Sequence, residues 1–483
     1  MLVRTCVPIN QTAAGTRGYP ARSMGRVLRR RISCAVWLFL AFSPLANARV
    51  GFFAPGGIPA ATVHQMPIVL FNAQNAAQVA MNMEKVNGTT VGVFVDLGHM
   101  ITQSMNVAEI GTKYAGADGV MRAKAFVPQI HSKLRAFPSD RRLKEVLDPV
   151  FAVLAKHAAN VYAVLPVDEP YLNGVSKVEL EHVGRVIRKL LNEHGLTKVK
   201  LGVIFASGMF DRRFAHLMHQ RAAVYVSGID DHFAKLEAAR NKSPAFAAWV
   251  DAMKKDRLTT YDQAGNMYVG GGLPRGYEVF GFDFYLSTLL LDGLHEDSLA
   301  WFAKHYPGSG CVQFSGETMS KLRSGLSFFR DGPVLQGSRY RLDDSRLLDA
   351  MYQCRMGAMT AMLQQAAGGR KAELLMIAES SNNGVLEFDV AGRPEPAQPE
   401  LLVQARVLDE VTRAEKFYEH NRCVYTAGLL YFTYADAYDR SIKLYVGGAA
   451  DMPAVMRSID DFSRKMRSHP AQCNGVGVPS AAR

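Results

Sequence analysis

Several motifs that mark common enzyme classes are missing from this sequence of 483 residues. There is no C-x-x-C pair and no G-x-S-x-G pentapeptide, and His182, His194 and His232 show no metal-ligand spacing. These absences argue against a thiolate zinc or redox site, an esterase of the usual α/β kind and a histidine metal centre. The triplet Gly270–Gly272 is not followed by the Lys-Ser/Thr of a phosphate-binding loop. We therefore expect no metal ion and no cofactor.

Acidic residues are missing from the first 48 residues, which contain seven arginines. Without this segment, the formal net charge of the chain falls from +12 to +5. No stripe of Lys and Arg stands out in the remainder, so we expect no nucleic-acid partner.

The N-terminal segment has the three parts of a secretory signal peptide. Arg26–Arg31 form a basic region, Ile32–Leu45 an apolar stretch and Ala46–Ala48 an A-x-A cleavage site. The apolar stretch is too short for a membrane-spanning helix, and no other segment is apolar for long enough. We expect cleavage after Ala48, a periplasmic or secreted protein and no stable membrane span after cleavage. The alternative is an uncleaved N-terminal anchor helix.

Four cysteines remain after that cleavage, an even number that suits an oxidising compartment: Cys311, Cys354, Cys423 and Cys473. They allow three connectivities of two disulfides. We favour Cys311–Cys354 with Cys423–Cys473, because these pairings close the shortest separate loops.

Apolar runs alternate along the chain with longer amphipathic stretches, as in βα units around a parallel sheet. Seven runs are apolar almost throughout, as strands buried on both faces must be: Pro67–Asn72, Thr90–Asp96, Val161–Val167, Val199–Ala206, Glu278–Tyr285, Glu373–Ala378 and Val424–Thr433. Helical periodicity is present in Leu143–Ala158, Lys177–Glu193, Ser298–Tyr306, Asp344–Ala367, Pro399–Tyr418 and Pro453–Ser468.

Two folds fit this alternation of strands and helices, and one of them is an open doubly wound sheet. We favour an α/β fold of the (β/α)₈ TIM-barrel type, because the strands cover the whole mature chain and end in acidic and aromatic residues.

The predicted barrel needs an eighth strand. Ala123–Ile130 is the best candidate and would be the third strand, and Ala222–Ile229 is its rival. We expect loop insertions at Gly98–Gly119, Asp230–Gly276 and Gly308–Arg341. The expected organisation is a signal peptide and N-terminal extension over residues 1–48, a single catalytic-type barrel over 49–469 and a C-terminal tail over 470–483.

Catalytic groups of (β/α)₈ barrels sit at the C-terminal ends of the strands. One predicted strand leads directly into Asp168 and Glu169, and Pro170 ends it. Because side chains alternate along a strand, we expect at most one of these two acids to face the barrel axis. Another strand, Glu373–Ala378, leads into Glu379 and a polar turn.

Further polar and aromatic side chains lie at or near the same strand ends. Acidic and amide groups there could bind sugar hydroxyls, and aromatic rings could stack on sugar faces. Asp283 could instead cap a strand by accepting hydrogen bonds from backbone amides. The candidates for substrate binding are Asp96, Asp168, Tyr171, Asp283, Tyr285, Asn382 and Tyr434.

With Ala123–Ile130 as the third strand, Glu169 ends the fourth strand and Glu379 the seventh. In this order the chain resembles the large clan of retaining glycoside hydrolases with (β/α)₈ barrels. The resemblance implies that Glu169 is the acid/base and Glu379 the nucleophile of a two-carboxylate reaction. The clan usually has Asn before its acid/base Glu, where this chain has Asp168.

The leading hypothesis is an extracytoplasmic glycoside hydrolase that cleaves a polysaccharide or oligosaccharide without a cofactor. The acid at position 168 motivates an alternative, a non-catalytic carbohydrate-binding or surface-polysaccharide assembly protein on the same barrel. A third hypothesis is a metal-dependent hydrolase that uses Asp96, Asp168, Glu169 and Asp283, although no histidine ends a strand. The sequence does not predict an oligomeric state.

Overall fold

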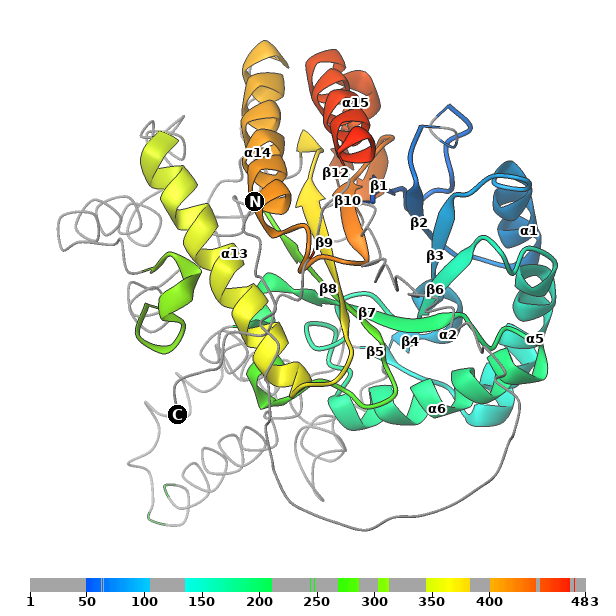
Figure 1. Ribbon diagram of the computed structural model, residues 1–483. Helices are drawn as coiled ribbons and strands as arrows, with labels where there is room; N and C mark the ends of the chain where they lie inside the picture. Colours follow the sequence, from blue (N-terminus) through cyan, green and yellow to red (C-terminus); the bar gives the residue numbers. More distant parts are fainter. Residues whose placement is uncertain are drawn as a thin grey trace, which may run out of the picture. The chain divides into compact units, whose positions relative to one another are not determined.

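Eight parallel strands form a closed barrel in the computed structural model of the chain (Figure 1). In chain order they are β1 (Val50–Phe53), β2 (Ile68–Asn72), β3 (Gly92–Asp96), β6 (Val161–Leu165), β7 (Lys200–Ala206), β8 (Val279–Phe284), β9 (Glu373–Glu379) and β10 (Gly428–Phe432). Each of these strands pairs with the next one along the chain, and β10 pairs with β1 to close the ring. The predicted (β/α)₈ fold is confirmed.

The structure describes residues 49–104 except 62 and 64, 135–210, 244, 247, 268–285, 303–311, 345–382, 400–439, 444–469 and 473. They belong to the compact unit Ser43–Arg483. The predicted signal peptide and most of the three predicted insertions lie outside the described residues.

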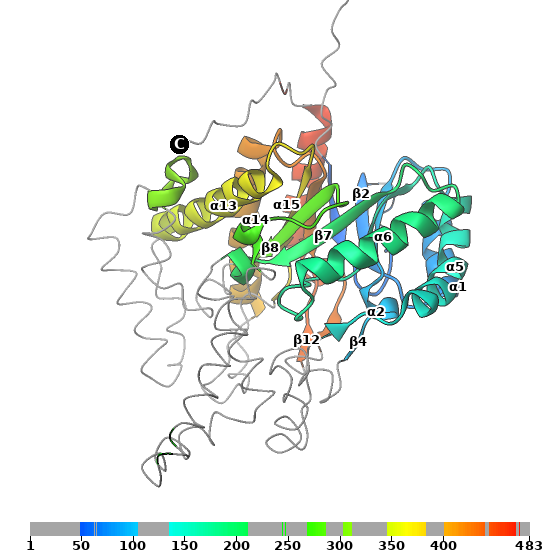
Figure 2. The ribbon, with the colours of Figure 1, turned by 90° about the horizontal axis from the view of Figure 1, so that it is seen from below.

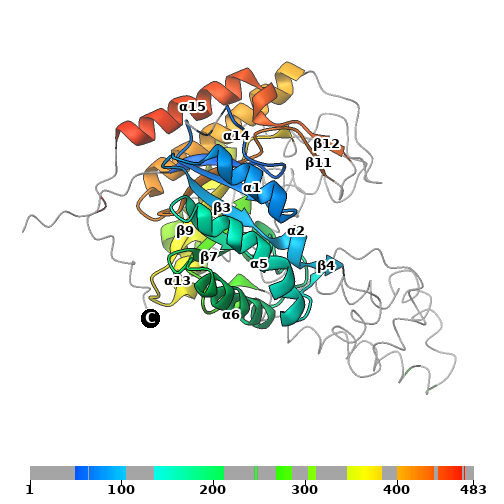
Figure 3. The same ribbon diagram turned by 90° about the vertical axis from the view of Figure 1, so that its right-hand side faces the viewer.

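Six of the helices that the structure describes lie outside the ring of strands (Figure 1): α1 (Ala76–Lys85), α5 (Asp140–Lys156), α6 (Lys177–Glu193), α13 (Ser345–Ala367), α14 (Glu400–Asn421) and α15 (Pro453–Ser468). In Figures 2 and 3, α1, α5 and α6 are neighbours, and so are α13, α14 and α15. Helix α6 has the predicted bounds because Ser176 and Glu179 form a reciprocal capping box at its start. Part of the predicted helix Ser298–Tyr306 lies outside the described residues.

Shorter elements connect these units. They are α2 (Gly98–Ile101), β4 (Gln103–Ser104), β5 (Arg135–Ala136), β11 (Ala437–Asp439), β12 (Leu444–Val446) and the 3₁₀ turns η1 (Ser207–Phe210), η4 (Val269–Gly271), η5 (Pro307–Ser309) and η9 (Ala449–Asp451). Strands β4 and β5 form one small antiparallel ribbon, and β11 and β12 form another.

The prediction of the eighth strand is wrong, because β1 completes the ring. Strand β3 pairs directly with β6, so Ala123–Ile130 does not stand between them. That segment and its rival Ala222–Ile229 lie outside the described residues. Since β1 precedes the first predicted strand, β6 is still the fourth barrel strand and β9 the seventh.

Side chains alternate between two buried layers along the barrel strands. One layer fills the barrel interior and includes Phe53, Ile68, Leu70, Phe94, Ala163, Leu165, Ile204, Val279, Leu375, Ile377 and Leu430. The other layer, which includes Phe52, Val69, Val95, Phe205 and Met376, packs beneath the helices. This two-sided burial explains the nearly continuous apolar runs in the sequence.

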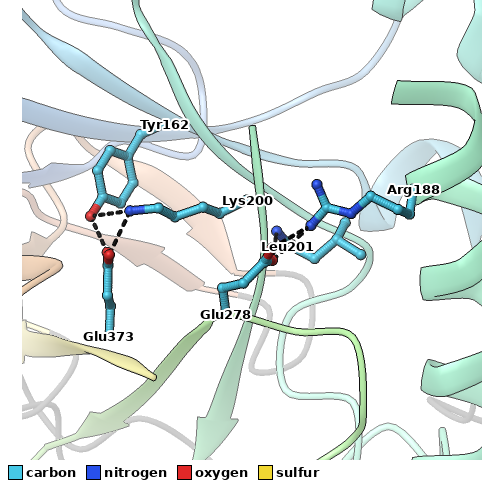
Figure 4. Close-up of polar contacts among 6 residues, drawn as sticks. All are labelled: Tyr162, Arg188, Lys200, Leu201, Glu278 and Glu373. Atoms are coloured by element: carbon cyan, nitrogen blue, oxygen red, sulfur yellow. Dashed lines mark hydrogen bonds and ion pairs between the residues drawn. The ribbon is translucent and has the colours of Figure 1, made fainter. Parts of the chain in front are cut away.

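Charged and aromatic groups close the amino ends of the strands (Figure 4). The Lys200 Nζ donates to Glu373 Oε1 at 2.6 Å and to the Tyr162 hydroxyl at 3.1 Å, and that hydroxyl donates to Glu373 Oε2. Beside them, Arg188 Nη2 contacts both carboxylate oxygens of Glu278 at 2.8 and 2.7 Å. In this fold the amino ends contribute to stability, whereas chemistry belongs to the opposite ends.

The predicted disulfide pairing is confirmed. Cys311 is bonded to Cys354 in α13, and Cys423 is bonded to Cys473. A search of the described helices finds none with the length and apolar character needed to cross a membrane.

Candidate active site at the carboxyl ends of the strands

The alternation of side chains along β9 places Glu379 inside the barrel mouth, which is the end of the barrel formed by the carboxyl ends of the strands. Leu375 and Ile377 of β9 belong to the barrel interior, and Glu379 follows at the same spacing of two residues. It lies in register with Phe432 of the adjacent strand β10 and is 1% exposed. Glu379 is therefore a buried acid at the carboxyl end of the seventh barrel strand.

The same alternation brings Asp96 and Asp283 to the interior at the ends of β3 and β8, since each follows inward-facing residues of its strand. Asp96 Oδ1 accepts a hydrogen bond from Gly98 N at 3.0 Å. Gly98 allows this turn to approach the segment that follows the fourth strand, because a Cβ there would lie 3.1 Å from the Val167 Cα. Burial raises the pKa of Asp96 to about 7.

Asp168 and Glu169 form the turn that follows β6. Asp168 pairs with Ile204 of β7, and Glu169 N donates to the Ile204 carbonyl at 3.1 Å. Glu169 has a φ of +45°, the left-handed region, which costs a non-glycine residue about 1–3 kcal/mol. Asn173 Nδ2 supports this conformation by donating to the carbonyls of Asp168 and Glu169, each at 3.1 Å. The turn ends the strict alternation of the strand.

The side chains of Glu169 and Asp283 are hydrogen-bonded to each other. Burial raises the pKa of Asp283 to about 7, the bond from Glu169 lowers it, and the nearby charge of Asp168 raises it. Two carboxyl groups need one proton to form such a bond, so Glu169 and Asp283 share a proton.

The phenol of Tyr285 lies among the acids of the mouth. Its pKa is raised well above the usual range by burial first, and then by the charges of Asp283, Glu379, Glu169 and Asp168. All four carboxyl groups are thus within electrostatic range of one hydroxyl group. The left-handed conformation of Glu169 interrupts the regular alternation of side chains after β6. The Tyr285 ring also lies 6.1 Å from the ring of Phe432.

The two carboxyl oxygens of Glu379 differ in their hydrogen bonds. Oε1 accepts a hydrogen bond from Ser381 N at 2.9 Å and a second from Ser381 Oγ. Oε2 is buried and has no hydrogen-bond partner among the described residues. Burial raises the pKa of Glu379 well above its usual range, the charge of Glu410 adds to this, and the bonds from Ser381 oppose it. Sequence reasoning missed the serine, whose only signal is its place in a polar turn.

Asp168 Oδ1 is also buried without a hydrogen-bond partner among the described residues. Burial raises the pKa of Asp168 well above its usual range, and the charges of Glu169 and Asp96 raise it further. Carboxyl groups at the mouth therefore keep their protons at pH values at which isolated carboxyl groups have already lost them. Within the described ranges, no three His, Cys, Asp or Glu side chains are grouped so that they could hold a metal ion.

Three of the predicted substrate-binding residues make structural contacts within the protein. Tyr171 is 2% exposed, and its ring lies 4.8 Å from that of Phe205 in the layer beneath the helices. Asn382 Oδ1 accepts from Gly447 N at 2.7 Å, and the Tyr434 ring lies 5.2 Å from that of Phe52. Tyr171 does not face the mouth, so we do not retain it as a stacking residue.

Comparisons with known proteins add little to this geometry. No protein-family model matches the chain, and a search among curated proteins finds no similar sequence. Among solved structures, the chain is similar to a GH26 β-mannanase from Bacteroides ovatus, with a TM-score of 0.33 and 10% sequence identity, covering 88% of this chain and 87% of that one. A likeness at this level says nothing about function, and the fold assignment stands on the closed barrel itself.

Proposed function

We propose that this protein is a glycoside hydrolase that cleaves a polysaccharide or oligosaccharide, with Glu169 as proton donor and Glu379 as nucleophile. The observation that carries the proposal is that Glu169 and Glu379 follow or end the fourth and seventh barrel strands at their carboxyl ends, with Glu169 hydrogen-bonded to Asp283. The reaction needs one carboxyl group that donates a proton and a second that attacks the sugar carbon, and this pair would supply both.

In the proposed reaction, Glu169 donates its proton to the leaving glycosidic oxygen while Glu379 Oε2 attacks the sugar carbon and forms a covalent glycosyl-enzyme. Glu169 then removes a proton from water, which hydrolyses that intermediate and restores both carboxyl groups. In this proposal Asp96, Asp168, Asp283 and Tyr285 would hold the sugar hydroxyls.

Activity is tested first by the release of reducing ends from purified soluble polysaccharides, and with aryl α- and β-glycosides. Release of reducing ends supports the proposal. A protein that retains a glycan on a binding array and releases no reducing ends would instead be the second candidate, a carbohydrate-binding protein on the same barrel. That candidate is favoured by one observation, the raised pKa of Glu379, because a protonated carboxyl group is a poor nucleophile.

The substitution Glu169→Gln is expected to slow the cleavage of unactivated glycosides by about 10²- to 10⁴-fold, the usual contribution of a general acid. Dinitrophenyl glycosides need no protonation of their leaving group, so the first step on them stays fast and shows a burst of dinitrophenol. Stopped-flow absorbance measures both. Glu145→Gln, in an exposed ion pair of α5, is the control. Equal losses on both substrate types would remove Glu169 from the acid role.

We also propose that the chain is exported and that residues 1–48 are removed. The two disulfides are compatible with an oxidising compartment. N-terminal sequencing of the protein recovered from the periplasm or medium is expected to begin at Arg49. A protein that is recovered from the membrane fraction with the segment Ile32–Leu45 still attached would support the anchor helix instead.

A further inference from the structure

We propose that Ser381 is a positioning residue that holds Oε1 of Glu379 and thereby presents Oε2 to the substrate. This inference rests on the proposed function only in taking Glu379 as the nucleophile. Both hydrogen bonds to Oε1 come from Ser381, one from its backbone N–H and one from its hydroxyl. Oε2 has no partner among the described residues, so it is the oxygen left to react.

A carboxyl group needs such a constraint because its terminal torsion is broad and nearly two-fold. Without fixed donors on one side, the two oxygens of Glu379 would exchange places. Two donors from a single residue define the plane of the group, and they leave one oxygen with a fixed direction. Pre-organisation of this kind contributes to rate when the reacting atoms must meet in one geometry.

Ser381 can act in this way because its neighbours are anchored on both sides. Ser380 N donates to the carbonyl of Phe432 at 2.7 Å, which ties the turn to β10. Asn382 N donates to the carbonyl of Gly447 at 3.0 Å, and Gly447 N returns a bond to Asn382 Oδ1 at 2.7 Å. The polar turn after β9 is therefore held to two other segments, and Ser381, which is 0% exposed, lies between the anchors.

The serine also supplies charge stabilisation at this position. The leading causes that raise the pKa of Glu379 are burial and the charge of Glu410, and the leading groups that oppose them are the Ser381 hydroxyl and the backbone N–H groups of Ser381 and Ser380. The hydroxyl is the one of these that a substitution can remove without altering the backbone.

The test is a pH titration of the full-length protein labelled with ¹³C at the Glu side-chain carboxyl carbon, with the Glu379 signal assigned by its loss in Glu379→Gln. Loss of the hydroxyl in Ser381→Ala is expected to raise the titration midpoint of Glu379 by about one pH unit or more. Ser381→Thr keeps a hydroxyl and is expected to return the midpoint toward that of the wild type. This measurement needs no substrate.

Ser380→Ala is the matched control, because the Ser380 hydroxyl donates to the carbonyl of Thr433 at 3.3 Å and not to Glu379. Its titration midpoint is expected to stay at the wild-type value. The same midpoint in Ser381→Ala and Ser380→Ala would overturn the inference.

The kinetic readout uses the dinitrophenyl glycoside that the wild type cleaves fastest. The acidic limb of its kcat/KM profile is expected to move by the same amount as the midpoint, with kcat about tenfold lower. An inactive wild-type protein would overturn the proposed function, whereas the titration would still decide the role of Ser381.

Discussion

Replacing Glu379 with Gln is expected to lower the rate of glycoside hydrolysis by about 10³-fold or more, on activated and unactivated substrates alike. The amide keeps the size of the side chain and can still accept hydrogen bonds from Ser381, so the fold is expected to persist. It cannot form the glycosyl ester, because an amide oxygen is a far weaker nucleophile than a carboxylate. Steady-state rates and thermal unfolding of the purified variant measure the two effects separately.

Glu373→Gln is the matched control for this substitution. It makes the same chemical change on the same strand, β9, but at the opposite end, where Glu373 binds Lys200. Its effect is expected to be a loss of stability with kcat retained. If Glu379→Gln hydrolysed glycosides at the rate of Glu373→Gln, Glu379 would have no part in the chemistry, and Asp283 would become the next candidate for nucleophile.

Replacing Asp96 with Asn is expected to stabilise the protein at about pH 8 by as much as about 4 kcal/mol, because the folded-state pKa of Asp96 is raised from 3.8 to about 7 by burial. An acid with a raised pKa binds its proton more tightly in the folded state. Its contribution to stability is complete below the unfolded-state pKa and is lost as the pH rises through the folded-state pKa. The amide of the Asp96→Asn variant does not ionise in this range, so this loss disappears.

Urea unfolding at several values from about pH 4 to about pH 8 measures this effect. The wild type and the Asp96→Asn variant are expected to be similar near pH 4 and to diverge as the pH approaches 7. Asp461→Asn changes an acid whose side chain is 69% exposed and serves as the control, with a pH dependence like that of the wild type. Parallel curves for wild type and Asp96→Asn would show that Asp96 ionises in the folded protein without cost.

The fold was predictable because both faces of each barrel strand are buried. Seven strands appeared in the sequence as apolar runs between amphipathic stretches, and helices α6 and α15 begin and end at the predicted residues. The first strand was missed because β1 is only four residues long and follows directly after the predicted cleavage site. The error left the order of the later strands unchanged, so Glu169 and Glu379 still follow the fourth and seventh strands.

The arrangement of the site was less predictable, because it depends on turns and not on strands. Asp96, Asp283 and Glu379 stand at or next to the ends of regular strands, which the apolar runs in the sequence indicated. Alternation gave no indication of the left-handed conformation of Glu169. It also gave no indication that Tyr171, two residues further on, folds back beneath the helices. The bonds from Ser381 to Glu379 likewise arise from a local turn.

In the proposed reaction, Glu379 forms the covalent bond to the sugar. The most direct test is mass spectrometry of peptides from the protein after incubation with a 2-deoxy-2-fluoroglycosyl fluoride of the sugar that the wild type cleaves. A retaining reaction predicts one glycosyl adduct per chain, carried by the peptide that contains Glu379 and absent from Glu379→Gln. An adduct on Asp283 or Glu169, or active protein that never forms one, would contradict the assignment.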